Sequence, residues 1–119
     1  MGSANNTGLQ GYNAANPRIR PILITVQLKG VSGTVPVQGP AFDIPEGCTV
    51  EVLPLAANAS TVFFSMLGPN AVLNSGTSEE VQKTATFPRE INIRNLSQLW
   101  ILASAGDGIK ITIRRPGLV

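Results

Sequence analysis

The chain has 119 residues, of which 43% are hydrophobic and 13% charged, and it carries a net charge of +2 with no histidine. This length supports one domain with one sizeable core. The weak positive charge argues against nucleic acid as a partner, and no apolar run approaches the roughly 18 residues that span a bilayer. The low charged share favours either burial against other subunits or a neutral surface rich in Ser, Thr and Asn.

Residues 1–17 are mostly small and polar, with only Leu9 and Tyr12 as apolar anchors. Such a segment cannot bury enough apolar surface to fold alone. One interpretation is a disordered tail that includes an added Met-Gly-Ser, and the other is an extended, flexible arm that lies on a neighbouring subunit. Arg18 and Arg20 follow between two prolines and form a small basic segment.

The first half of the domain contains segments with the two-residue period of β-strands. The first strand is predicted to have one solvent face, because Thr25, Gln27 and Lys29 lie opposite an apolar face formed by Ile22, Ile24, Val26 and Leu28. The segment 35–37 contains a proline and suits an edge strand. Residues 49–55 alternate in the same way, whereas residues 61–67 are apolar on both faces. Cys48, the single cysteine, precedes a strand and is predicted to be a small buried side chain.

The second half begins with a predicted strand of mixed polarity over residues 80–87. Residues 91–94 and 109–114 alternate cleanly, as in strands with one buried face. The segment Leu99–Ala105 is apolar on both faces, which predicts a strand in the middle of a sheet or under a partner subunit. Gly106-Asp107-Gly108 lies before the last strand and predicts a hairpin, because glycine reaches positive φ at little cost.

The chain therefore shows about eight short strands separated by turn signals, a pattern typical of an antiparallel sandwich or barrel. We predict an antiparallel β-sandwich, jelly-roll-like rather than immunoglobulin-like. The sandwich domain is predicted over residues 22–115, after an arm over 1–21 and before a tail over 116–119. The predicted core consists of inward strand residues: Ile24, Val26, Val50, Val52, Phe64, Ile91, Ile93, Ile101, Ile111 and Ile113.

The sequence offers little catalytic chemistry. No histidine is present to act as a base, and one cysteine cannot form a zinc site. Trp100 could stack on a sugar or a base, but at the centre of an apolar run it fits a core or an interface better. We predict no enzymatic activity, no metal and no cofactor. All carboxylates lie at turns or on outward strand positions and are predicted to be solvated, although two could meet as a glycosidase pair: Asp43, Glu46, Glu51, Glu79, Glu80, Glu90 and Asp107.

Two stretches carry a resemblance to a known family. The first is IPEGCTVEV at residues 44–52, followed by a small-residue loop, the strand TVFF and the polar loop NSGTS. The second is PREINIRNLSQLWILASAGDGIKITI at residues 88–113. In this order, over residues 42–114, the chain resembles small virion β-modules of tailed bacteriophages.

The resemblance implies a virion structural protein, most like a capsid decoration or cement protein, made in the host cytoplasm and placed on the capsid surface. Its implied partners are the major capsid protein and further copies of itself, with no nucleic acid and no membrane. The predicted capsid contacts of the arm are Leu9, Tyr12, Arg18 and Arg20. Apolar side chains on the second faces of strands are predicted to form a homotrimer interface: Phe63, Leu67, Trp100 and Leu102.

Two alternatives stay open. The first is a tail or head-fibre domain that binds host-surface glycans, which an aromatic platform on exposed loops would favour. Aromatic residues make up only 5% of the chain, and the sequence shows no such platform. The second is a small metabolic β-barrel enzyme, which the missing histidine weakens.

Overall fold

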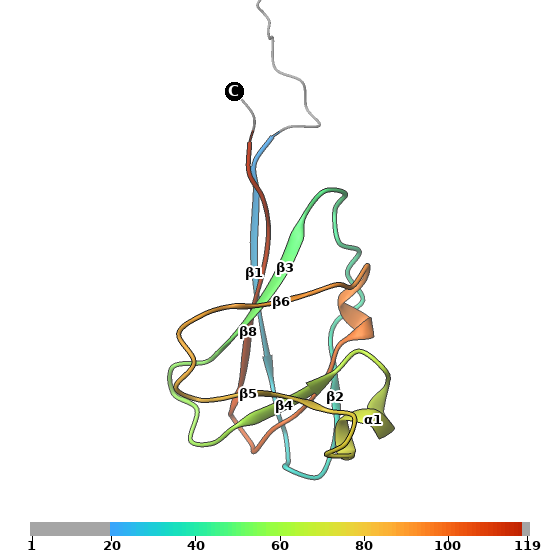
Figure 1. Cartoon of the computed structure of the whole chain (residues 1–119), viewed down its shortest axis with the longest axis vertical. Coiled ribbons are helices and arrows are strands. Elements are labelled where there is room, and N and C mark those ends of the chain that lie inside the picture. The colour runs from blue at the N-terminus through green and yellow to red at the C-terminus, as the bar shows by residue number, and fades with distance from the viewer. Residues whose placement is uncertain (1–19, 118–119) are drawn as a thin grey trace, which may run out of the picture.

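The structure, a computed structural model, describes residues 20–117, and this part of the chain contains eight strands and two short helical segments (Figure 1). The all-β fold predicted from the sequence is confirmed. In chain order the elements are β1 (Ile22–Lys29), β2 (Val37–Gln38), β3 (Thr49–Pro54), β4 (Val62–Ser65), α1 (Pro69–Leu73), β5 (Glu79–Val81), β6 (Arg89–Ile91), the 3-10 helix η2 (Leu96–Gln98), β7 (Trp100–Leu102) and β8 (Gly108–Arg115).

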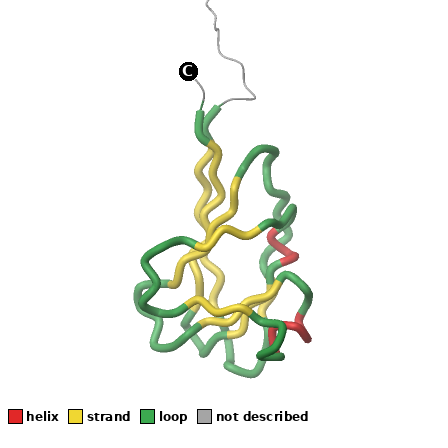
Figure 2. Tube along the Cα trace, in the orientation of Figure 1, coloured by secondary structure: helices red, strands yellow, loops and turns green. Residues whose placement is uncertain are grey.

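The strands form two antiparallel sheets of four. The first sheet has the strand order β1-β8-β3-β6, and the second sheet has the order β2-β7-β4-β5. Four pairings nest inside one another: β4 with β5, β3 with β6, β2 with β7, and β1 with β8. The chain thus resembles one long hairpin, folded back between β4 and β5, whose two halves pass together from sheet to sheet. The outermost pair, β1 and β8, runs along the long axis of the molecule (Figure 1). Both helical segments lie on the same side in Figure 2.

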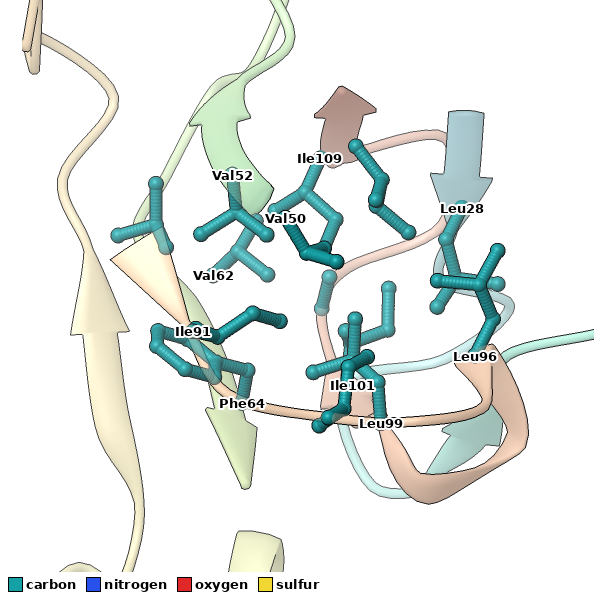
Figure 3. Packing of buried hydrophobic residues seen from close by; sticks show 14 of the residues in the cluster. Leu28, Val50, Val52, Val62, Phe64, Ile91, Leu96, Leu99, Ile101 and Ile109 are labelled. Atoms are coloured by element: carbon teal, nitrogen blue, oxygen red, sulfur yellow. The ribbon is translucent and has the colours of Figure 1, made fainter. Parts of the chain in front are cut away.

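A single hydrophobic cluster takes residues from both sheets, as in a β-sandwich (Figure 3). The strand register explains its composition, since Val50 is paired with Ile91 on one side and Ile113 on the other. Ile24 and Val26 pack against the cluster but are only partly buried, because β1 is an edge strand. The other predicted core residues are all buried: Val50, Val52, Phe64, Ile91, Ile93, Ile101, Ile111 and Ile113.

The predicted hairpin at Gly106-Asp107-Gly108 is wrong. The strands on either side of it, β7 and β8, belong to different sheets, so these residues form a crossover between the sheets. Gly106 has φ of +86°, a conformation that favours glycine. A tight crossover needs the same residue types as a hairpin turn, and the local sequence cannot distinguish the two.

Two predicted strands are longer than the observed ones. Of the strand predicted over 99–105, only the three residues of β7 form a strand. As predicted, β7 lies inside its sheet, between β2 and β4. Of the strand predicted over 80–87, only the residues that belong to β5 form a strand. Leu99 and Ala103, which flank β7, still belong to the core, whereas Ala105 and Phe87 are exposed.

Asn95 joins the connection before β3 to the connection before β7. Its Oδ1 accepts hydrogen bonds from the amides of Ser97 at 2.9 Å and Phe42 at 3.2 Å, and its Nδ2 donates to the Asp43 carboxylate at 2.7 Å. The Gln98 Oε1 atom accepts from the Asn95 amide at 2.9 Å, which completes a capping box around η2. One short polar segment therefore fixes a long-range contact between two connections.

Candidate association surfaces

Arg115 fixes the place where the chain enters the fold. Its guanidinium donates to the carbonyl oxygen of Arg20 at 2.9 and 3.2 Å, and to that of Glu46 at 2.9 Å. Arg20 comes just before β1, whereas Glu46 lies in the turn before β3, so one side chain ties two strand starts together. Arg20 is exposed, and its predicted contact with the capsid stays a prediction. The other predicted arm contacts lie outside the described residues: Leu9, Tyr12 and Arg18.

Phe63 and Leu102 lie next to each other on the outer face of the second sheet. They are direct cross-strand partners on β4 and β7, while the alternate residues Phe64 and Ile101 point into the core. Both are half-buried and line a groove of about 340 Å³. The groove is also lined by Gly33, Ser60, Thr61, Ala103 and Ser104.

Trp100 lies on the same outer face as Leu102, two residues before it on β7. Helix α1 packs against β4 and β7, and its Val72 is 2% exposed without belonging to the core cluster. Trp100 itself is half-buried. Leu67 follows β4 and is 78% exposed. Of the four predicted interface residues, the structure therefore brings three onto one face.

A second groove, of about 470 Å³, lies beside Lys110. Lys110 on β8 is paired with Gln27 of β1 and Leu53 of β3, on the solvent side of the first sheet. Lys83, from the connection after β5, also lines the groove and donates to the carbonyl oxygen of Ala59 at 3.2 Å. The apolar lining consists of Leu53, Pro54, Leu55, Ala56 and Ala85. Two ammonium groups over an apolar lining suit a ligand with carboxylate groups.

Asp107, predicted to be solvated, is instead 6% exposed and anchors the loop before β4. Its carboxylate accepts hydrogen bonds from the Ala59 amide and from the amide and hydroxyl of Ser60, each at 3.1 Å. The Ala59 amide above all, then the groups of Ser60, hold the pKa of Asp107 below its ordinary value against the opposing effect of burial. The carboxylate is therefore ionised at neutral pH.

Asn58 completes this anchor. Its Nδ2 donates to the carbonyl oxygen of Gly108 and its Oδ1 accepts from the Gly108 amide, both at 2.8 Å. The side chain thus forms the two bonds that a paired strand residue would form with Gly108. Because Ser60 and Thr61 line the groove beside Phe63, this anchor also fixes one wall of that groove. The small polar loop was visible in the sequence, but its acceptor, almost fifty residues further along the chain, was not.

Several large apolar side chains are exposed that the sequence did not single out. Phe87 is 86% exposed in the connection between β5 and β6, Leu23 is 72% exposed on β1, and Val31 is 64% exposed just after β1. Their exposure depends on which strands lie at sheet edges and which residues leave the ladder, and both are properties of the assembled fold.

Among residues 20–117, no helix is long and apolar enough to cross a membrane, and no group of three or more potential metal ligands comes together. Comparisons with protein-family models, with curated proteins and with solved structures found no match. The resemblance to phage virion modules therefore stays a prediction.

Proposed function

We propose that the protein is a bacteriophage decoration protein, which binds the outer surface of the head and stabilises the shell. The observation that carries this proposal is the contact between Arg115 and the carbonyl oxygen of Arg20. A decoration protein needs a stable body, a segment that reaches the shell, and a fixed point between the two. Arg115 provides such a point at the end of the β1–β8 pair.

The length of the segment before this point is compatible with the role. Nineteen residues precede Arg20, and an extended chain of that length reaches up to about 60 Å. Ordering it on a shell costs about 1–2 kcal/mol of backbone entropy per residue. Leu9 and Tyr12 cannot offset that cost alone, so backbone hydrogen bonds to the shell, formed by strand addition, belong to the proposal.

The groove beside Lys110 supports a second contact with the shell. Lys83 and Lys110 present two positive charges beside an apolar lining. Acidic side chains of the major capsid protein would complement these ammonium groups and the guanidinium group of Arg20. Exposed ion pairs contribute about 0–1 kcal/mol each, so they orient the protein more than they hold it.

The order of the strands supports a finer description of the scaffold as a jelly roll. In that fold eight strands form two sheets through two Greek keys. The nested pairing of β1 with β8, β2 with β7, β3 with β6 and β4 with β5 is the pairing expected of it.

The proposal is tested by adding purified protein to heads that lack it and measuring the bound fraction by sedimentation. A variant without residues 1–17 provides the comparison, and its far-ultraviolet dichroism shows whether it has folded. We expect the full chain to bind heads and the folded truncated chain to bind much more weakly. Electron microscopy of virions with labelled protein should show copies spread over the head. Labels confined to the tail would contradict the decoration function.

The groove beside Phe63 favours one other function, glycan binding by a tail or fibre domain. A half-exposed aromatic ring with hydroxyl groups around it can stack on a sugar and bond its hydroxyls. Titration with host-surface polysaccharide, using the wild type and a Phe63→Ala variant, tests this alternative. Binding that is lost in the variant would favour it over decoration, and no binding by the wild type would exclude those polysaccharides as ligands.

A further inference from the structure

We propose that two copies of this chain pair edge to edge through β1, in antiparallel orientation, so that their first sheets join into one continuous sheet. This inference concerns self-association and does not depend on the proposed function. It differs from the homotrimer that the sequence predicts, and it places the interface on the first sheet in place of the second.

The first observation is the length of the open edge. β1 has eight residues and is the outermost strand of its sheet, and within residues 20–117 its only paired strand is β8. The other sheet edges are much shorter, with two residues in β2 and three each in β5 and β6. Soluble proteins usually shorten, bend or charge their edge strands, since an open edge pairs with other chains. In β1 the only charged residue is Lys29, at its end.

The second observation is that the core is incompletely covered along this edge. Ile24 and Val26 are only partly buried, although their partners on β8, Ile113 and Ile111, are fully buried. On the opposite face Leu23 is 72% exposed. A further strand beside β1 would cover the flanks of Ile24 and Val26 and would satisfy the free backbone groups of the edge.

The required occupant is a strand with apolar side chains at alternate positions on its inner face. The segment before β1 in the same chain does not fit, because residues 2–17 contain only Leu9 and Tyr12 as large apolar residues. β1 of a second copy does fit, since its own alternation supplies the inner face. Arg115 holds the chain at the Arg20 end of β1, so in an antiparallel pair the two preceding segments leave at opposite ends and do not obstruct each other.

The side-chain pattern also selects the register. Strands centred on Thr25 place Ile24 opposite Val26 of the partner copy and Leu23 opposite its Gln27. No two like charges then lie opposite each other within β1. A shift by one residue would place inner apolar side chains opposite outer polar ones, which pairing strands avoid. The pairing is thus self-complementary along most of β1.

Light scattering and sedimentation velocity of the full chain test the proposal directly. We expect a dimer for the wild type at micromolar concentration. Ile24→Lys and Val26→Glu should each weaken pairing about ten-fold or more, because each places a charge in the apolar flank of the interface. Mixing the two variants should restore a dimer, since the introduced ammonium group of one chain would then face the introduced carboxylate of the other. Far-ultraviolet dichroism checks that each variant is folded.

A Thr86→Lys variant is the control, because it adds the same charge at an exposed position in the connection between β5 and β6. It should dimerise as the wild type does. A wild type that remains monomeric at about 100 μM, above the range of Kd expected for a specific pair, would overturn the proposal. So would a trimer that Ile24→Lys leaves intact and Leu102→Lys dissociates, or folded single variants whose mixture stays monomeric.

Discussion

The carboxylate of Asp107, in the connection from β7 to β8, accepts hydrogen bonds from both the amide and the hydroxyl of Ser60, in the connection from β3 to β4, each at 3.1 Å. With the bond from the Ala59 amide, these contacts satisfy three donors of a loop that has no strand partner of its own. Asp107→Asn should therefore lower the thermal midpoint at neutral pH. Glu46→Gln, at an exposed carboxylate in a turn, is the matched control and should leave the midpoint nearly unchanged.

The stabilisation by Asp107 should depend on pH. Its folded-state pKa is lowered, chiefly by the Ala59 amide, so the ionised form is favoured in the native state. The contribution is fully present above the unfolded pKa, about 3.9, and is lost as pH falls from there through the lower folded pKa. The difference in unfolding free energy between wild type and Asp107→Asn should shrink over that range. A difference that stays constant from pH 7 to below pH 3 would show that ionisation of Asp107 contributes nothing.

The alternation of Val50, Ile111 and Ile113 was enough to predict the core, because a two-residue period in several strands points to one shared interior. The role of Asp107 could not be predicted, since its partners are far away in sequence and its own neighbours, two glycines, indicate an exposed turn. The edge position of β1 was equally hidden, because the order of strands in a sheet depends on long-range pairing. The local sequence pattern therefore predicts which face of each strand is buried, but not which strands lie next to each other in a sheet.

Gly39 should be intolerant of any side chain. A Cβ atom there would overlap the carbonyl oxygen of Leu96, which lies at the start of η2. Gly39→Ala must therefore displace backbone, and we expect a loss of about 1–3 kcal/mol in unfolding free energy. Gly33 is the control, because a Cβ atom there meets nothing within 4 Å. Urea denaturation should show Gly33→Ala to be neutral or stabilising by up to about 1 kcal/mol. Equal effects of the two changes would contradict the close approach at Gly39.

Asn95 should contribute more to stability than its half-buried position suggests. Asn95→Ala removes the acceptor for two amides and the donor to Asp43. Loss of an N-cap side chain costs about 0.5–2 kcal/mol, and we expect the upper part of that range because the Asp43 contact is lost as well. Asn92→Ala, at an exposed position three residues earlier, should change stability by less than about 0.5 kcal/mol. Chemical denaturation of both variants measures the difference.

Arg115 should determine how firmly the chain is held where it enters the fold. Arg115→Gln cannot reach the carbonyl oxygens of both Arg20 and Glu46, so the two strand starts lose their shared contact. We expect a global loss of only about 1 kcal/mol, since the site is partly exposed, but faster amide exchange in residues 22–24 and 46–48. Arg94→Gln, at an exposed arginine, is the control and should leave exchange in both segments unchanged.

The same variant separates the role of Arg115 in stability from its role in docking. If the contact at Arg20 directs the preceding segment toward a shell, Arg115→Gln should bind undecorated heads more weakly than the wild type at a temperature where both are fully folded. The Arg94→Gln control should bind as the wild type does. Faster exchange at residues 22–24 together with unchanged head binding would mean that Arg115 stabilises the end of the β1–β8 pair and has no part in docking.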